Sequence, residues 1–148
     1  MRNFFTKLDA NQGYWQIPLD HESSLLTTTN TPFGRIRFMR LPYGIHTAQE
    51  IFHKRVANIL ASIDNVETDI DDVLIHGENV DSHHIDLIRS LDKLKENNVT
   101  LNINKCVFGV SEVTYLGHRI NAQGVHPDEA KIKAIKEMPT PTNEKDIQ

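Results

Sequence analysis

The order of strand-like and helix-like segments is the feature that most restricts the fold of this chain. Short runs of β-favouring residues alternate with runs whose apolar residues recur at helical spacing, and turn residues separate them. Strands are expected at 3–9, 66–70, 73–77 and 100–104, with one helix between the first two strands and one between the last two. This order, strand-helix-strand-strand-helix-strand, predicts an α+β fold of the split βαβ, or ferredoxin-like, type.

Both helices are predicted from their start signals and their apolar faces. Thr47 and Glu50 have the spacing of a capping box, and the apolar residues that follow at i, i+4, i+7 and i+8 are Phe52, Val56, Ile59 and Leu60. Asp81 or Ser82 is expected to cap the second helix, and Asn97 and Asn98 to end it. Its predicted buried face consists of Leu87, Ile88, Leu91 and Leu94.

Three further segments lie outside that order. Two β-leaning runs within 23–40 flank the turn residues 31–34, which predicts an inserted hairpin. Residues 113–120 are expected to form another strand, and Pro127 to open a last helix with acids early and lysines late.

Three aspartates are placed where the predicted strands end. Asp9 closes the first strand, and Asp71 and Asp72 form the expected tight turn after the second. Because the first two strands of a right-handed βαβ unit run parallel, both end at the same edge of the sheet, and the three carboxylates should converge there. Acids are also common in exposed turns, so their placement alone leaves that plainer interpretation open.

A carboxylate cluster of this kind has a specific chemical use. Mg²⁺ prefers oxygen ligands and usually takes one or two protein carboxylates together with substrate phosphates. Two such ions, about 3.5 to 4 Å apart, stabilise both the attacking and the leaving oxygen of a phosphoryl transfer. The cluster is therefore consistent with nucleotidyl transfer.

Charge and cysteine content limit the alternatives. Sixteen Lys and Arg against twenty Asp and Glu give a formal charge of -4, which is unfavourable for holding a polyanion and indicates that basic surfaces lie in other parts of a larger protein. The single cysteine, Cys106, excludes an internal disulfide framework. There is no signal-peptide pattern and no apolar run of membrane-spanning length, so a soluble, intracellular protein that is not secreted is expected.

Four ordered blocks cover nearly all of the chain: FTKLDANQGYWQIPLD, TPFGRIRFMRLPYGI, IDDVLIHG and LNINKCVFGVSEVTYLGHRI. Together they resemble the reverse transcriptase of gypsy-type LTR retrotransposon Pol polyproteins. The resemblance implies a reverse-transcriptase palm over residues 1–122, with fingers and thumb largely missing. Residues 123–148 would then hold a C-terminal helix and the start of a connection toward an RNase H region.

The resemblance also assigns catalytic residues. Asp9 matches the first catalytic aspartate of the family, and Asp71 and Asp72 match the aspartate pair of its Tyr-x-Asp-Asp motif, which binds two Mg²⁺ ions, with Mn²⁺ possible. Lys105 falls in the block whose lysine is a candidate proton donor to the leaving pyrophosphate, although a solvated surface lysine is an equally good interpretation.

Substrate-binding residues follow in the same way. Tyr14 matches the aromatic residue that excludes a ribose 2′-hydroxyl. The remaining residues of the implied nucleotide pocket are Ala10, Asn11, Gln12, Gly13, Tyr43 and Gly44. Those implied to contact primer or template are Arg35, Arg37, Leu116, Gly117 and His118.

Asp69 departs from the family pattern, which usually has Tyr or an apolar residue there. Alternation along a strand puts Glu67, Asp69 and Asp71 on one face, where a third acid could raise the pKa of a neighbour through like-charge repulsion or offer a competing metal ligand. The implied activity is an RNA-directed DNA polymerase that acts on dNTPs and a primed RNA or DNA template, in the cytoplasm or a retrotransposon particle.

The implied partners are the remaining Pol domains, namely fingers, thumb, RNase H and integrase. Without them we expect the isolated chain to extend a primer poorly. Two alternatives stay open: a catalytically inactive retrotransposon remnant that acts as a binding domain, and another carboxylate-dependent phosphotransferase or nuclease.

Overall fold

The central element of the computed structural model is a four-stranded antiparallel sheet. The structure describes residues 2–128, 132–133 and 136–137. The strands lie in the order β4 (Val66–Asp69), β5 (Asp72–Gly77), β1 (Phe4–Asp9), β6 (Val107–Val110). Each strand pairs antiparallel with its neighbour, so β1 and β4 run parallel with β5 between them. The predicted split βαβ order is confirmed.

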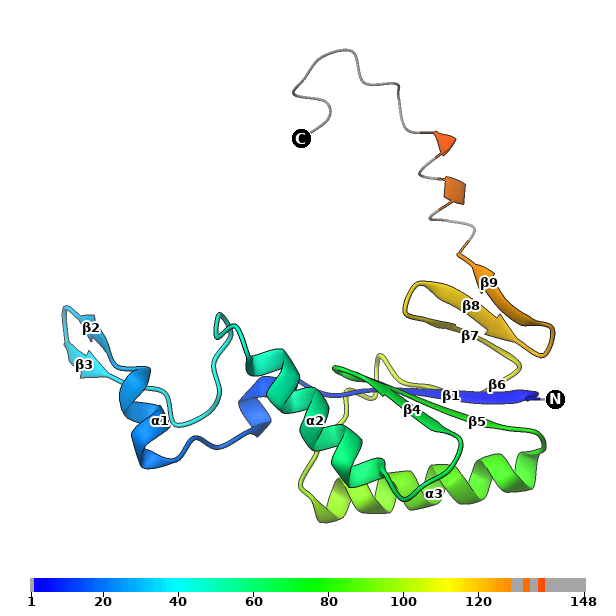
Figure 1. Cartoon of the computed structure of the whole chain (residues 1–148), viewed down its shortest axis with the longest axis horizontal. Coiled ribbons are helices and arrows are strands. Elements are labelled where there is room, and N and C mark those ends of the chain that lie inside the picture. The colour runs from blue at the N-terminus through cyan, green and yellow to red at the C-terminus, as the bar shows by residue number, and fades with distance from the viewer. Residues whose placement is uncertain (1, 129–131, 134–135, 138–148) are drawn as a thin grey trace.

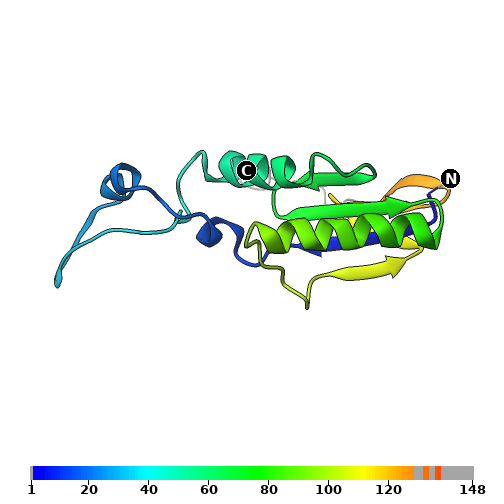
Figure 2. The same cartoon turned by 90° about the horizontal axis from the view of Figure 1, so that it is seen from below.

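Two helices, α2 (Ala48–Leu60) and α3 (Val80–Glu96), pack against one face of this sheet (Figures 1 and 2). Alternate residues of β1 and β5 meet the apolar stripes of both helices, as the period of two in a strand requires. The residues buried in this core include Leu8, Phe52, Val56, Leu60, Val73, Ile75 and Leu94. The helices therefore leave the opposite face of the sheet for other elements.

A second sheet covers part of that opposite face (Figure 1). It consists of β7 (Glu112–Tyr115), β8 (His118–Asn121) and β9 (Gly124–Pro127). The prediction of one strand over 113–120 is wrong, because Leu116 and Gly117 both have positive φ, at 50° and 73°, and form a two-residue turn of the I′ kind between β7 and β8. The predicted boundary after residue 122 falls in the turn between β8 and β9.

The predicted strand at 100–104 is also wrong. Leu101 makes an isolated bridge to Ala10, and the chain then turns at Asn102. The side-chain oxygen of Asn102 accepts a hydrogen bond from the Asn104 N–H, and the backbone carbonyl of Asn102 accepts one from the Lys105 N–H. Asparagine competes with strand pairing through such local bonds, so the last strand of the sheet, β6, begins only at Val107.

The insertion between β1 and α2 projects from the body of the molecule (Figure 1). It contains the short helices η1 (Gly13–Gln16) and α1 (His21–Leu26) and the hairpin β2 (Thr29–Thr31) with β3 (Gly34–Ile36). The predicted hairpin is confirmed, but the beginning of its first run, up to Leu26, is helical. The Asp20 carboxylate accepts a hydrogen bond from the Ser23 N–H at 2.7 Å and so caps the N-terminus of α1. This cap favours the helix more than the β propensity of the following residues favours a strand.

The helix ends differ from the prediction in detail. α2 starts where expected, but the side chain of Thr47 makes no capping bond. α3 starts earlier than expected, because Asn79 rather than Asp81 or Ser82 is its N-cap. Ile88 of the predicted buried face is 47% exposed, whereas Leu94 is buried. The predicted end of α3 at Asn97 is confirmed.

Pro127 ends β9 instead of opening a helix. The described residues beyond it make α-helical hydrogen bonds, from the Ile132 N–H to Asp128 O and from the Glu137 N–H to Lys133 O. The rest of the predicted last helix lies outside the described residues. Within the described part of the chain, no helix is both long and apolar enough to span a membrane.

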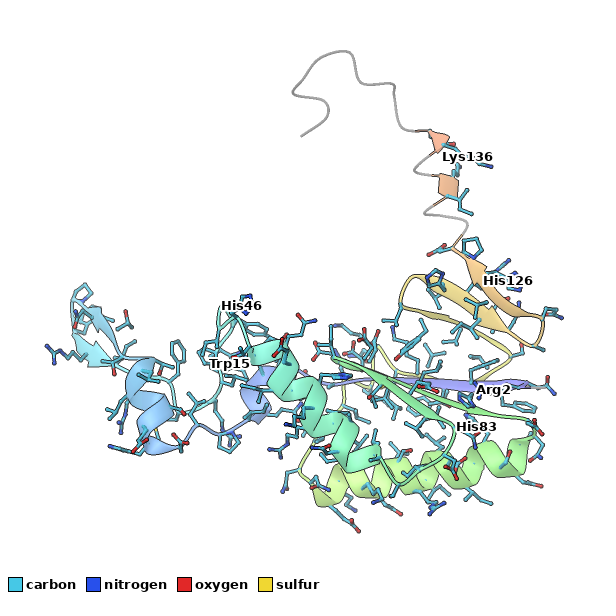
Figure 3. The ribbon with its side chains drawn as sticks, in the orientation of Figure 1. Arg2, Trp15, His46, His83, His126 and Lys136 are labelled. Carbon is cyan, nitrogen blue, oxygen red and sulfur yellow. The ribbon has the colours of Figure 1, made fainter. Side chains whose placement is uncertain are left out.

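Two buried histidines lie where α3 meets the sheet. His76 of β5 is 2% exposed and His83 of α3 is 5% exposed, the latter labelled near the N-terminal end of α3 in Figure 3. Neither ring nitrogen of His76 has a hydrogen-bond partner among the described residues. Burial lowers the pKa of both histidines, and the Asp86 carboxylate only partly opposes it. Both rings therefore take up a proton less readily than an exposed imidazole.

These histidines predict acid sensitivity. In the folded protein their pKa values lie below the ordinary value near 6.5, so the unfolded chain binds more protons as the pH falls. The free energy of unfolding therefore decreases below about pH 6.5, by at most roughly 1.4 kcal/mol per pH unit for each ring. Urea unfolding between pH 7.5 and 5 measures this slope. His76→Leu should reduce it, whereas His21→Leu, at an exposed position, should not. Equal slopes for both variants would contradict the assignment.

Candidate active site

The three aspartates converge at one end of the four-stranded sheet. Asp9 and Asp72 are the last residue pair of the β1–β5 ladder, directly opposite each other. The strand pair β4–β5 closes with Asp69 opposite Asp72, so the two-residue turn consists of Ile70 and Asp71. The prediction that Asp71 and Asp72 form the turn is therefore wrong by one residue. Their predicted convergence with Asp9 is confirmed.

Two lysines form ion pairs with Asp9 and Asp72. The Nζ of Lys105 lies 3.6 Å from Asp9 Oδ2, and the Nζ of Lys7 lies 3.2 Å from Asp72 Oδ2. In contrast, Asp71 Oδ1 is buried and has no hydrogen-bond partner among the described residues. Burial raises the pKa of Asp71, and the charges of Asp9 and Asp72 raise it further against the opposing effect of Lys105. The cluster thus contains an unsatisfied oxygen in a negative environment.

These oxygens fit a hard divalent cation when substrate supplies further ligands. No group of three or more His, Cys, Asp or Glu side chains in the described ranges is arranged to hold a metal ion by itself. Mg²⁺, however, usually takes only one or two protein carboxylates, with water and phosphate oxygens as its other ligands. The orphaned Asp71 Oδ1 and the facing pair Asp9 and Asp72 match that donor set.

The turn that carries Asp71 has a strained backbone. Ile70 has a φ of 51°, a region that costs a β-branched residue about 1–3 kcal/mol and that glycine usually occupies at the first position of such a turn. Strain of this kind is often found at functional sites. The position of the Asp71 carboxylate therefore depends on a backbone shape that other parts of the molecule must hold.

Gly13 allows three elements to meet beside Asp71. A Cβ atom at this position would lie 2.6 Å from the ring of Phe52 and 2.8 Å from Asp71 Oδ1, closer than real Cβ contacts. Phe52 belongs to the buried core of α2, with no exposed surface. The backbone of η1 therefore packs directly against α2 and the carboxylate, and any side chain at position 13 would displace one of them.

Aromatic rings form one wall beside the carboxylates. The ring centroid of Tyr14 lies 5.1 Å from that of Tyr43 and 6.1 Å from that of Phe52. Burial, followed by the negative charge of Asp71, raises the pKa of the Tyr14 phenol. The structure thus brings Tyr14 and Tyr43, which are 29 positions apart in sequence (43 minus 14), together at the aspartate cluster. Gly44 follows with a φ of 92°.

Gln16 organises the loop that precedes η1, a role that the sequence did not reveal. Its Nε2 donates to Asn11 O at 2.6 Å and to Thr100 O at 3.0 Å, while its Oε1 accepts from the Thr100 N–H at 2.9 Å. The partner Thr100 is 84 residues away, so no local pattern could have indicated the bond. Gln16 thereby ties the backbone beside Gly13 to the segment that leads to Lys105.

The remaining predicted residues lie in two other elements. Leu116 and Gly117 form the β7–β8 turn and His118 begins β8. Arg35 lies in β3 and Arg37 follows it, both exposed on the projecting hairpin of Figure 1. The structure therefore does not bring these arginines to the aspartates.

Asp69 affects a different neighbour from the one expected. Burial raises the pKa of Tyr115 to about 12, with further contributions from the carboxylates of Asp69, Asp72 and Glu67. The charges that raise the pKa of Asp71 are those of Asp9 and Asp72. The extra acid therefore acts mainly on the β7 tyrosine that covers the outer face of the sheet.

Comparison with known proteins gives a consistent result. Residues 1–120 match the family described as reverse transcriptase (RNA-dependent DNA polymerase). The chain is 32% identical over 147 residues to the retrovirus-related Pol polyprotein from transposon 297 of Drosophila melanogaster, and 35% identical over 142 residues to that from transposon gypsy of the same organism. These matches cover 98% and 93% of this chain but 14% of each polyprotein.

The fold is similar to that of a solved polymerase structure. A foamy viral protease-reverse transcriptase in complex with double-stranded DNA superimposes with a TM-score of 0.91 at 23% identity. The match covers all of this chain and 26% of the viral one. The chain thus spans about a quarter of that protein and a seventh of the transposon polyproteins.

Proposed function

The chain belongs to the reverse transcriptase (RNA-dependent DNA polymerase) family, and on this premise we propose that it is the palm segment of a retrotransposon polymerase. Its reaction is the transfer of the nucleotidyl group of a dNTP to a primer 3′-hydroxyl on an RNA or DNA template, with release of pyrophosphate. The observation that carries the proposal is the meeting of Asp9, Asp71 and Asp72 at one sheet end, where Asp71 Oδ1 is buried without a hydrogen-bond partner.

Asp9, Asp71 and Asp72 would hold two Mg²⁺ ions, or Mn²⁺. Bound there, such ions neutralise the phosphates and lower the pKa of the attacking hydroxyl. The protein's own contribution is to hold the three carboxylates together at one end of the sheet, facing the substrate. Lys7 and Lys105 pair with Asp72 and Asp9 and so offset part of the negative charge of the cluster.

Lys105 also suits the leaving group. Its side chain is 66% exposed and its ammonium lies at the edge of the cluster, 3.6 Å from Asp9 Oδ2. An exposed ammonium in this place can approach a pyrophosphate and donate a proton to it. Tyr14 and Tyr43 would bound the sugar and base of the incoming nucleotide, with the backbone of residues 10–13 beside its triphosphate.

The β7–β8 turn, with Leu116, Gly117 and His118, is proposed to hold the primer end, and Arg35 and Arg37 to contact template phosphates.

The foamy viral relative binds double-stranded DNA as a much longer chain. We therefore propose that fingers, thumb, RNase H and integrase regions of a Pol polyprotein complete the polymerase, within a retrotransposon particle.

A segment exchange tests the function. Residues 1–120 of this chain would replace the matching segment of the transposon gypsy Pol polyprotein, to which it is 35% identical. We expect the chimera to extend a primed RNA template with dNTPs and Mg²⁺. A chimera that folds and binds primed template yet adds no nucleotide would overturn the proposal and favour a non-catalytic remnant that only binds.

Tyr14 should control sugar selection in that chimera. Removing the ring by Tyr14→Ala opens the wall formed with Tyr43 and Phe52, so the ribose 2′-hydroxyl is no longer excluded. We expect the preference for dNTP over rNTP, measured as the ratio of kcat/KM values, to fall by about 100-fold, or roughly 3 kcal/mol. Tyr14→Phe is the matched control and should keep the preference. An unchanged ratio in Tyr14→Ala would exclude this role.

A further inference from the structure

His53 of α2 makes a hydrogen bond to the strained turn beside the aspartates. Its Nδ1 accepts from the backbone N–H of Ile70 at 3.1 Å, in a partly buried position. The β4–β5 ladder ends at the pair Asp69 and Asp72, so the Ile70 N–H lies beyond the ladder. A side chain 17 residues away therefore holds the backbone immediately before Asp71.

The helix that carries His53 is itself firmly placed. Phe52, the preceding residue, is fully buried and its ring lies against the backbone of Gly13. Two successive residues of α2 thus act near Asp71, since Phe52 limits the approach of η1 and His53 holds the turn. Movement of α2 would be transmitted to the carboxylate through both contacts.

The surroundings of His53 leave its imidazole free to act as an acceptor. A cavity of about 500 Å³ lies beside it, lined by His46, Gln49, Glu50, His53, Asp69 and Ile70. His46 lies just before the N-terminal end of α2 in Figure 3. An Nδ1 that accepts a hydrogen bond carries no proton, so the ring proton is on Nε2.

We propose that His53 is a positioning residue for Asp71. The hydrogen bond from the Ile70 N–H to its Nδ1 stabilises the positive φ of Ile70, and this backbone shape directs the Asp71 carboxylate toward Asp9 and Asp72. The proposal rests on the proposed function only in so far as Asp71 binds a metal ion. The hydrogen bond and its effect on the turn can be tested without metal.

The test compares three substitutions in the full chain. His53→Ala removes the acceptor. His53→Asn places a carbonyl oxygen near the position of Nδ1, and His53→Gln places one near Nε2 instead. Amide hydrogen exchange at Ile70, measured by NMR, should be faster by about 10-fold in His53→Ala and His53→Gln, and close to that of the parent in His53→Asn. His46→Ala, in the same cavity, is the control and should leave exchange unchanged.

A second measurement reports on Asp71 itself. Binding of Mn²⁺ alone, followed by the EPR signal of the free ion, should weaken by about 10-fold in His53→Ala and recover in His53→Asn. Unchanged Ile70 exchange, or equal values for the Asn and Gln variants, would overturn the positioning role. Absence of Mn²⁺ binding in the parent chain, with Ile70 exchange as expected, would instead count against the proposed metal site and leave the positioning role intact.

Discussion

Asp71→Asn in the chimeric polymerase is expected to lower the rate of primer extension by about 10³-fold, because several kcal/mol of charge stabilisation depend on the metal ligands and each 1.4 kcal/mol corresponds to a factor of ten. The same substitution should make the chain more stable at pH 7. The pKa of Asp71 is raised on folding, so its charged form costs stability at any pH above the ordinary value of an aspartate.

Opposite changes in activity and stability would identify Asp71 as a residue kept for function. Single-turnover primer extension measures the first, and urea unfolding of the chain measures the second. Asp64→Asn is the matched control, because Asp64 is an exposed acid shortly before β4 and should affect neither quantity. If Asp71→Asn kept full activity, the carboxylate cluster would not be the catalytic centre.

The largest effect on stability is expected from Phe52→Ala. Phe52 has no exposed surface and contacts both the core and the backbone of Gly13. Truncating a fully buried phenylalanine typically costs about 3–5 kcal/mol, since transfer energy is lost and a cavity remains. We expect a decrease of this size in the free energy of unfolding, measured by urea denaturation of the chain.

Ile51 provides the control for this prediction. It precedes Phe52 in α2 but is 45% exposed, so Ile51→Ala should cost about 1 kcal/mol or less. Phe52→Ala should also alter the environment of Tyr14, whose ring packs edge-on against Phe52 with a centroid separation of 6.1 Å. Similar losses for both variants would show that α2 is not anchored as the structure indicates.

The order of secondary structure elements could be predicted because each depends mainly on nearby residues. The helical stripe of Phe52, Val56 and Leu60 identified the buried face of α2 correctly. The errors came where short-range hydrogen bonds compete with these patterns. Asp20 turns a β-leaning run into α1, and Asn102 delays the last strand of the sheet.

The three aspartates of the candidate site could be predicted from the sequence, but the residues that contact them could not. The strand order correctly indicated that Asp9, Asp71 and Asp72 would meet. Asp69 was expected to affect the neighbouring aspartates, yet its charge contributes to the raised pKa of Tyr115, because β7 returns over the outer face of the sheet. No pattern in the sequence could show that return.

The sequence by itself thus determined the split βαβ order, the family, and the identity of the three aspartates, since periodicity and motif spacing are properties of short segments. The tertiary structure decided what surrounds those aspartates. Lys105 pairs with Asp9 across 96 positions of sequence (105 minus 9), and His53 holds the turn at Ile70. Such contacts form only when separate elements pack together, and they determine which carboxylate oxygens pair with lysines and that Asp71 Oδ1 has no hydrogen-bond partner among the described residues.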